Sequence, residues 1–295
     1  MSDSSDAPGV EAALGLPRGR AYRGGQDRLR TRVRVLATFI CATTALLPAA
    51  LSAQEKIALA GSPELAPRPS PPLESAPPTR ADSLAADAAR AAAAADRRLR
   101  ILVSIAERRL AVVNGADTLM TAPAAVGMDR RLTYDGRSWT FRSPRGVRFV
   151  TGRTARDSWI PPDWHYAEVA REYHLRLARL RTDSAVVLDD GSILTTRDRK
   201  VGLVRRDGGF APLPVDEEIV FDGTLYVPPP GTENRAITGE LGEYQLDLGG
   251  GYLIHGTPHQ NSIGTATTHG CVRLDDEQIA WLYDHIPIGT PVYIY

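Results

Sequence analysis

The sequence predicts a mainly β domain with a few helices, preceded by about a hundred residues that lack core-forming patterns. Short apolar runs separated by Asp-Gly, Gly-Gly and Pro-rich turns are typical of strands, and only two segments in the second part of the chain have helical spacing. No strand-helix alternation or phosphate-binding glycine loop is present, which excludes a doubly wound nucleotide-binding fold. The formal net charge of +0 gives no basic surface, so no nucleic-acid partner is expected.

The N-terminus has the layout of an export signal. Arginines between Arg28 and Arg34 precede an apolar stretch from Val35 to Leu47, and small residues follow as far as Ala53. We interpret residues 1–53 as a signal peptide, with a retained membrane anchor as the alternative because the apolar run nearly reaches a spanning length when extended. Either form places the body of the protein outside the cytoplasm, in the periplasm or cell envelope.

Residues 54–99 are expected to form a Pro/Ala-rich linker. Prolines crowd residues 61–79 and favour extended backbone that cannot build a core. The alanine-rich stretch 81–100 has high helix propensity but no large apolar face, so it predicts a solvated helix. This region is interpreted as either a tether or a passive spacer.

The folded domain is predicted to span residues 100–295. It begins with strands at 101–105 and 110–113, a hairpin that Asn114-Gly115 is expected to close. Helical spacing predicts helices over 163–180 and 275–285. Further strands are predicted at 147–151, 185–188, 192–196, 200–205, 218–221, 224–227, 252–255 and 291–295.

The chemistry-bearing residues lie together between His255 and Leu274, in the sequence HGTPHQNSIGTATTHGCVRL. Removal of the signal, which contains Cys41, would leave Cys271 as the sole thiol, unable to form an internal disulfide. A thiol is mostly protonated at neutral pH, so a nucleophilic cysteine needs an imidazole, and His255 and His269 are the candidates.

Other interpretations of this stretch remain open. Cys271 taken alone is also compatible with a buried small hydrophobe. A zinc site formed by His255, His259, His269 and Cys271 matches no usual ligand spacing, so no metal is predicted, and His259 is interpreted as a loop residue. The turn at Gly270 could direct backbone amides toward an oxyanion.

The stretch resembles the signature of L,D-transpeptidases, the YkuD-type catalytic domain, in which His-Gly-Thr precedes Ser/Thr-His-Gly-Cys-x-Arg. Ser143–Gly146 is similar to the family's Thr-Pro-x-Gly turn, and residues 291–294 to its closing strand. The resemblance implies an L,D-transpeptidase-type β-sandwich of mixed sheets. This chain departs from the compact family core over residues 153–248, an inserted helical/loop segment. Its aromatic residues Trp159, Trp164 and Tyr166 could form a lid that selects the acceptor, or add packing.

The resemblance implies a role for each residue of the signature. Cys271 would be the nucleophile and His255 the proton acceptor and donor, while His269 would shape the site without being the base. Gly270 would supply an oxyanion donor from its backbone. Gly256 and Thr257 would orient His255 and contact substrate. Arg273 would bind a substrate carboxylate, with an ion pair to Asp275 or Asp276 as the alternative.

The implied substrates are peptidoglycan stem peptides. In the family reaction the cysteine attacks the carbonyl of the third residue of a tetrapeptide stem, expels D-alanine and holds a thioester, which an amine of another stem or of a protein then resolves. No cofactor or metal is required. A hydrolase that trims stems or detaches wall-bound lipoprotein would share the same intermediate. A non-catalytic peptidoglycan-binding module is the alternative of another class, against which the intact Cys271, His255 and Gly270 count. No oligomeric state is predicted.

Overall fold

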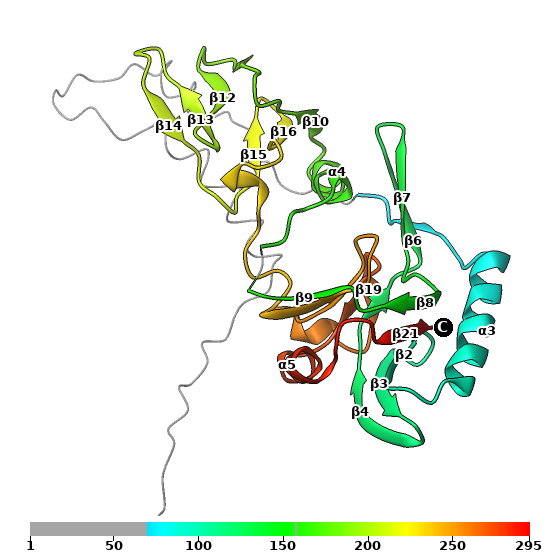
Figure 1. The fold of residues 1–295 in the computed structure, drawn as a ribbon. Coiled ribbons are helices and arrows are strands. Elements are labelled where there is room, and N and C mark those ends of the chain that lie inside the picture. The colour runs from blue at the N-terminus through cyan, green and yellow to red at the C-terminus, as the bar shows by residue number, and fades with distance from the viewer. Residues whose placement is uncertain (1–69, 157) are drawn as a thin grey trace, which may run out of the picture.

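The computed structural model describes residues 70–156 and 158–295, and the predicted export signal lies outside these residues. A five-stranded mixed sheet forms one half of the main β body (Figure 1), in the order β4-β3-β2-β21-β8. Strands β2 and β21 are parallel, and the other neighbours are antiparallel. The bounds are β2 Arg100–Ser104, β3 Arg109–Asn114, β4 Asp117–Pro123, β8 Gly146–Phe149 and β21 Pro291–Ile294.

A second mixed sheet, in the order β20-β18-β17-β9, carries the signature residues. Its strands are β9 Gly152–Ala155, β17 Tyr244–Asp247, β18 Leu253–His255 and β20 Val272–Arg273, and a two-stranded sheet of β5 Val126–Gly127 and β19 Ala266–Thr268 adjoins it. Helix α5, Asp276–His285, packs Ile279 and Leu282 into the same core. Apolar residues of both large sheets form that one core, so the body is a β-sandwich.

The segment that precedes the sandwich is part of the folded structure. Helix α3, Arg80–Ala95, begins with a capping box between Thr79 and Asp82. Its Ala89 and Ala93 are buried, and the helix packs against β21 and β8. The predicted helix is confirmed, but it is not solvated on all sides, because small alanine side chains let it approach the sheet closely without a large apolar face.

The sequence between β9 and β17 forms an inserted body beside the sandwich (Figure 1). Because β9 and β17 themselves pair within the second sheet of the sandwich, the insertion covers residues 156–243, a narrower range than predicted. It contains α4 Asp163–Glu172, β10 Arg176–Arg179, β11 Val186–Val187, β12 Ile193–Arg197, β13 Lys200–Val204, β14 Phe210–Pro212, β15 Ile219–Phe221, β16 Thr224–Val227 and the 3₁₀ turn η1 Glu233–Arg235. These strands form the sheets β10-β16-β15 and β11-β12-β13-β14, with cores of their own.

A hairpin of the sandwich reaches the insertion. It consists of β6 Arg130–Tyr134 and β7 Arg137–Phe141, with β1 Glu74–Ser75 along its edge. Leu132 and Phe141 pack against Ala167 of α4, and the Tyr134 hydroxyl donates a hydrogen bond to the Leu175 carbonyl at 2.6 Å. These contacts fix α4 relative to the sheet that carries the signature.

All predicted strands are present, with ends shifted by a few residues, and the helix predicted at 275–285 is confirmed as α5 with Asp275 as its N-cap. The helix predicted over 163–180 is correct only to Glu172. His174 has a φ of 53°, which ends the helix, and residues 176–179 then pair in parallel with β16. The turn Asn114-Gly115 closes the hairpin of β3 and β4 rather than that of β2 and β3.

Within the described part of the chain, no helix is long and apolar enough to cross a membrane.

Candidate active site

The parallel pairing of β18 with β20 brings the signature residues together. Ile254 pairs with Val272, and both side chains enter the sandwich core. Neighbouring side chains on a strand alternate between the two faces of a sheet. His255 and Arg273, which pair with each other, therefore lie on the face opposite the core, and Cys271 immediately precedes β20.

His255 is held in one orientation by its own backbone. His255 is only 3% exposed, and its Nδ1 lies 2.6 Å from the Gly256 carbonyl oxygen. Because a carbonyl only accepts hydrogen bonds, this contact assigns the proton of the neutral ring to Nδ1, so Nε2 is the ring atom that can accept a proton. Burial lowers the pKa of His255 to about 4, the charge of Arg273 adds to this effect, and the Gly256 backbone opposes it. The imidazole is therefore neutral at neutral pH.

Cys271 is partly exposed and follows a tightly held turn. Burial raises the pKa of its thiol, while a hydrogen bond from the Leu253 backbone and the charge of Arg273 act in the opposite direction. The Thr268 hydroxyl accepts from the Gly270 amide at 3.1 Å and donates to the Cys271 carbonyl at 2.6 Å. The Gly270 amide, predicted as an oxyanion donor, thus already has a partner in this state.

Gly270 is the residue that this turn requires. Its φ of 136° is disfavoured for residues with side chains. A Cβ there would lie 2.9 Å from the Arg142 carbonyl oxygen and 3.0 Å from a ring carbon of Tyr252. The backbone before Cys271 can pass so close to β7 and β18 only because Gly270 has no side chain.

His269 contacts the insertion. Its Nε2 lies 2.9 Å from Oε2 of Glu168. Trp164 stacks on the imidazole with ring centroids 3.9 Å apart and planes 14° apart, and Phe141 meets it edge-on at 4.5 Å. Two residues of α4 therefore hold a histidine that lies two positions before Cys271, a contact that the sequence did not predict.

Glu240 is a second site residue that sequence reasoning missed. It lies 3.4 Å from His259 Nε2, and its charge acts on both Arg273 and His255. Burial raises its pKa, but the hydrogen bond and charge of His259 prevail and the pKa is lowered overall. Arg273 faces this acid rather than forming an ion pair with Asp275, and among the described residues its Nε has no hydrogen-bond partner.

Thr257 borders a cleft of about 620 Å³. Thr257 itself is 1% exposed, and its hydroxyl accepts a hydrogen bond from the His259 amide at 3.1 Å. The other lining residues lie at the two ends of the insertion, in the loop after Thr257 and at the start of α5: Arg156, Thr238, Gly239, Gly242, Glu243, Pro258 and Asp276. The cleft therefore lies beside the backbone that orients His255.

The aromatic residues of the insertion divide into two groups. Tyr166 is buried within the insertion, with the Arg235 guanidinium 4.8 Å from its ring, so it serves packing. Trp159 and Trp164 contact each other with centroids 5.8 Å apart, and Trp164 continues to His269. The aromatic wall predicted from sequence therefore consists of the two tryptophans, without Tyr166.

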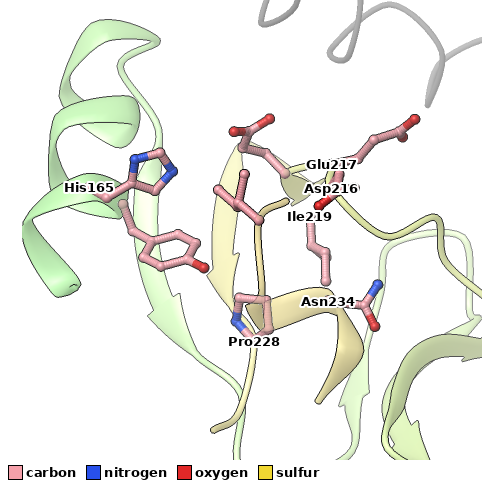
Figure 2. Close-up of a pocket in the computed structure, with 9 residues that line it drawn as sticks. His165, Asp216, Glu217, Ile219, Pro228 and Asn234 are labelled. Carbon is pink, nitrogen blue, oxygen red and sulfur yellow. The ribbon is translucent and has the colours of Figure 1, made fainter. Parts of the chain in front are cut away.

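A small cavity of about 10 Å³ lies inside the insertion (Figure 2), where His165 faces acidic residues that include Asp216 and Glu217. Its walls include no residue of the signature. Burial lowers the pKa of His165 to about 4. In the part of the chain that the structure describes, no group of three or more His, Cys, Asp or Glu side chains could hold a metal ion.

Comparison with known proteins gives the family. The profile of YkuD, the L,D-transpeptidase catalytic domain, matches residues 98–294. The chain is 43% identical over 54 residues to a probable L,D-transpeptidase, ErfK/SrfK, of Salmonella typhimurium, and 42% identical over 66 residues to a probable L,D-transpeptidase, YbiS, of Escherichia coli. These matches cover 18% and 22% of this chain, and 18% and 20% of the relatives.

Among solved structures, an L,D-transpeptidase from Xylanimonas cellulosilytica is 15% identical, with a TM-score of 0.35, over 77% of this chain and 64% of that chain. The family profile covers the sandwich strands and the whole signature, including His255 and Cys271. The chain therefore belongs to the YkuD family of L,D-transpeptidase catalytic domains.

Proposed function

We propose that this protein is an exported peptidoglycan L,D-transpeptidase that uses Cys271 as its nucleophile and His255 as its proton acceptor and donor. The observation that carries the proposal is the pairing of β18 with β20, which places His255 beside Arg273, two residues after Cys271. A neutral imidazole with its proton on Nδ1 is the form that can accept the thiol proton. Membership of the family supports stem peptides as the substrate class.

In the acylation step, the thiol proton passes to Nε2 of His255 as the sulfur attacks the carbonyl of the third stem residue. The bond between this carbonyl and the terminal D-alanine then breaks, and the D-alanine nitrogen takes the proton from His255. A thioester on Cys271 remains. Arg273 supports this step because its positive charge lowers the pKa of the thiol, and the turn at Gly270 is the proposed site of the developing oxyanion.

In the second step, an amine attacks the thioester, gives its proton to His255 and releases the thiolate. The cleft beside Thr257 supports entry of an acceptor from this side, since it is bordered by the loop that follows His255. Arg273 is proposed to bind a stem carboxylate, a role supported by the Nε hydrogen that has no partner among the described residues.

Product analysis tests the transferase assignment. Purified tetrapeptide muropeptides are incubated with the protein and the products are weighed by mass spectrometry, with Cys271→Ala as the control. Dimers that lack one D-alanine are expected from wild type and none from the variant. Trimmed monomers alone would identify a hydrolase instead, and unchanged substrate would support a non-catalytic binding module.

A further inference from the structure

Helix α4 contacts the turn that carries the thiol through one residue, His269. Glu168 lies 2.9 Å from the imidazole Nε2, Trp164 stacks on one ring face and Phe141 meets the ring edge-on. The hydrogen bond fixes which ring atom faces α4, and the two aromatic contacts fix the plane of the ring. These three contacts together define a single orientation of the His269 ring.

We propose that Glu168 is a positioning residue for the transpeptidase reaction. It accepts the Nε2–H of His269, and by holding that side chain it holds the turn from Thr268 to Cys271 and so the place of the thiol. This inference rests on the proposed function of Cys271. It also gives the insertion a role in the chemistry, because the acceptor for His269 comes from residues outside the sandwich.

Helix α4, which carries Glu168, packs firmly against the β6–β7 hairpin. Ala167, its neighbour on α4, is fully buried against Leu132 and Phe141 of the β6–β7 hairpin. Trp164 also meets Phe141 edge-on, with centroids 5.5 Å apart. Because both ends of the contact are anchored, the hydrogen bond to His269 transmits the position of α4 to the turn.

Other contacts also restrict the conformation of the turn from Thr268 to Cys271. On its inner side, Gly270 already lies against the Arg142 backbone and the Tyr252 ring. The Thr268 hydroxyl ties its ends together. A misplacement of about 1 Å in a reacting group can cost roughly 100-fold in rate. Loss of the acceptor at Glu168 would release the one side chain of the turn that reaches the insertion.

The test measures acylation of Cys271 by imipenem, a carbapenem whose strained lactam carbonyl is open to attack by a nucleophilic thiol. Intact mass spectrometry follows adduct formation in wild type, Glu168→Ala, Glu168→Gln and Tyr134→Phe. We expect Glu168→Ala to slow acylation about tenfold or more, as loss of an orienting partner commonly does. Glu168→Gln keeps an acceptor oxygen of the same reach, so its rate should stay within about threefold of wild type.

Tyr134→Phe is the matched control. It removes another contact between the hairpin and the insertion, the 2.6 Å hydrogen bond to the Leu175 carbonyl, without touching His269. We expect it to lower the melting temperature slightly and to leave acylation unchanged. All rates are taken at a temperature at which circular dichroism shows every variant folded.

Nitrogen-15 chemical shifts of the His269 ring give a second readout, because they would not change if Glu168 only stabilised the fold. Wild type and Glu168→Gln should show the Nε2–H tautomer, and Glu168→Ala a mixture of tautomers. Acylation of Glu168→Ala at the wild-type rate, or equal slowing in the alanine and glutamine variants, would overturn the inference. Absence of any adduct on wild type would instead overturn the proposed function of Cys271, so the two failures are distinguishable.

Discussion

The histidines near the thiol differ in what holds each ring. His255 is buried against the Gly256 carbonyl, His269 is bound by Glu168, and His259 lies beside Glu240. The Gly256 carbonyl fixes the tautomer of His255 without adding a negative charge, whereas Nε2 of His269 is already engaged by Glu168. These environments support His255, rather than the histidine nearer in sequence to Cys271, as the proton acceptor.

The buried His255 should make stability depend on pH. Its pKa falls from 6.5 to about 4 on folding. Between these values the unfolded chain binds the proton and the folded chain does not, so stability is complete above pH 6.5 and is lost as pH falls toward 4. The ring contributes on the order of 3 kcal/mol to this loss. Urea unfolding of His255→Gln from pH 7 to 4.5 should show a shallower decline than wild type.

His165 has a similarly lowered pKa, to about 4, and supplies the comparison. His165→Gln should remove a comparable part of the decline, and the double variant most of it. An unchanged pH dependence in His255→Gln would show that this imidazole is not buried in the neutral form.

Gly270 should tolerate no side chain. Gly270→Ala would place a Cβ 2.9 Å from the Arg142 carbonyl oxygen at a strained φ, and a cost of about 1–3 kcal/mol is expected. We predict a lower melting temperature in thermal unfolding and loss of acylation by imipenem. Gly223→Ala is the control, because Gly223 also has a positive φ, of 68°, but open space around its Cβ position. Comparable effects of the two substitutions on acylation would contradict the steric argument.

At the scale of elements, α5 supports the strand that bears His255. Ile279 and Leu282 of this helix pack into the core, and the helix lies against β17, which pairs with β18. The Asp275 side chain caps the helix by accepting from the amides of Glu277 and Gln278. The helix therefore begins directly after the signature, at a position fixed by its N-cap residue, Asp275.

Removal of this cap should destabilise the protein. Asp275→Ala is expected to lower the free energy of unfolding by about 1 kcal/mol, and Asp275→Asn by much less because asparagine also caps helices well. Chemical denaturation of both variants measures the difference. Equal losses would mean that the charge of Asp275, rather than its cap geometry, stabilises the helix.

The segment 163–180 shows why a helical pattern in the sequence predicted too long a helix. Tyr173, Leu177 and Leu180 have helical spacing, which predicted one long helix. In the structure Tyr173 ends α4, while Leu177 lies in β10 and Leu180 just after it. Pairing with β16, a strand almost fifty residues later, decided the outcome, and no local pattern reports such a partner.

At the scale of the whole molecule, the sandwich and the insertion have separate apolar cores. The sheet β11-β12-β13-β14 is built on the smaller clusters, and its outer strands are short. Local stability follows the density of buried contacts. We therefore expect the insertion to unfold locally at a lower free energy than the sandwich.

Hydrogen exchange followed by mass spectrometry should resolve this difference. We expect amides of β12 and β13 to exchange at a lower free energy than those of β2 and β21, which lie in the centre of the five-stranded sheet. Peptides of α4 should fall between the two because the helix contacts both bodies. Uniform protection throughout would mean that the chain unfolds as one unit.

The site itself was only partly predictable from sequence. His255 and Cys271 could be found because they lie in one contiguous signature on adjacent strands. Glu168 could not, because it reaches His269 across 101 residues of chain through the packing of α4 on the hairpin. Glu240 likewise comes from the C-terminal end of the insertion. Residues brought in by tertiary packing carry no motif of their own.

Mapping the covalent adduct tests the central claim most directly. Wild type, Cys271→Ser and His255→Gln are treated with imipenem, their acylation rates are measured by intact mass, and the modified peptide is sequenced. We predict that the wild-type adduct lies on Cys271, that Cys271→Ser forms none, and that His255→Gln reacts at least about 100-fold more slowly, as expected for loss of a general base. An adduct on another residue, or a wild-type rate in His255→Gln, would contradict the account.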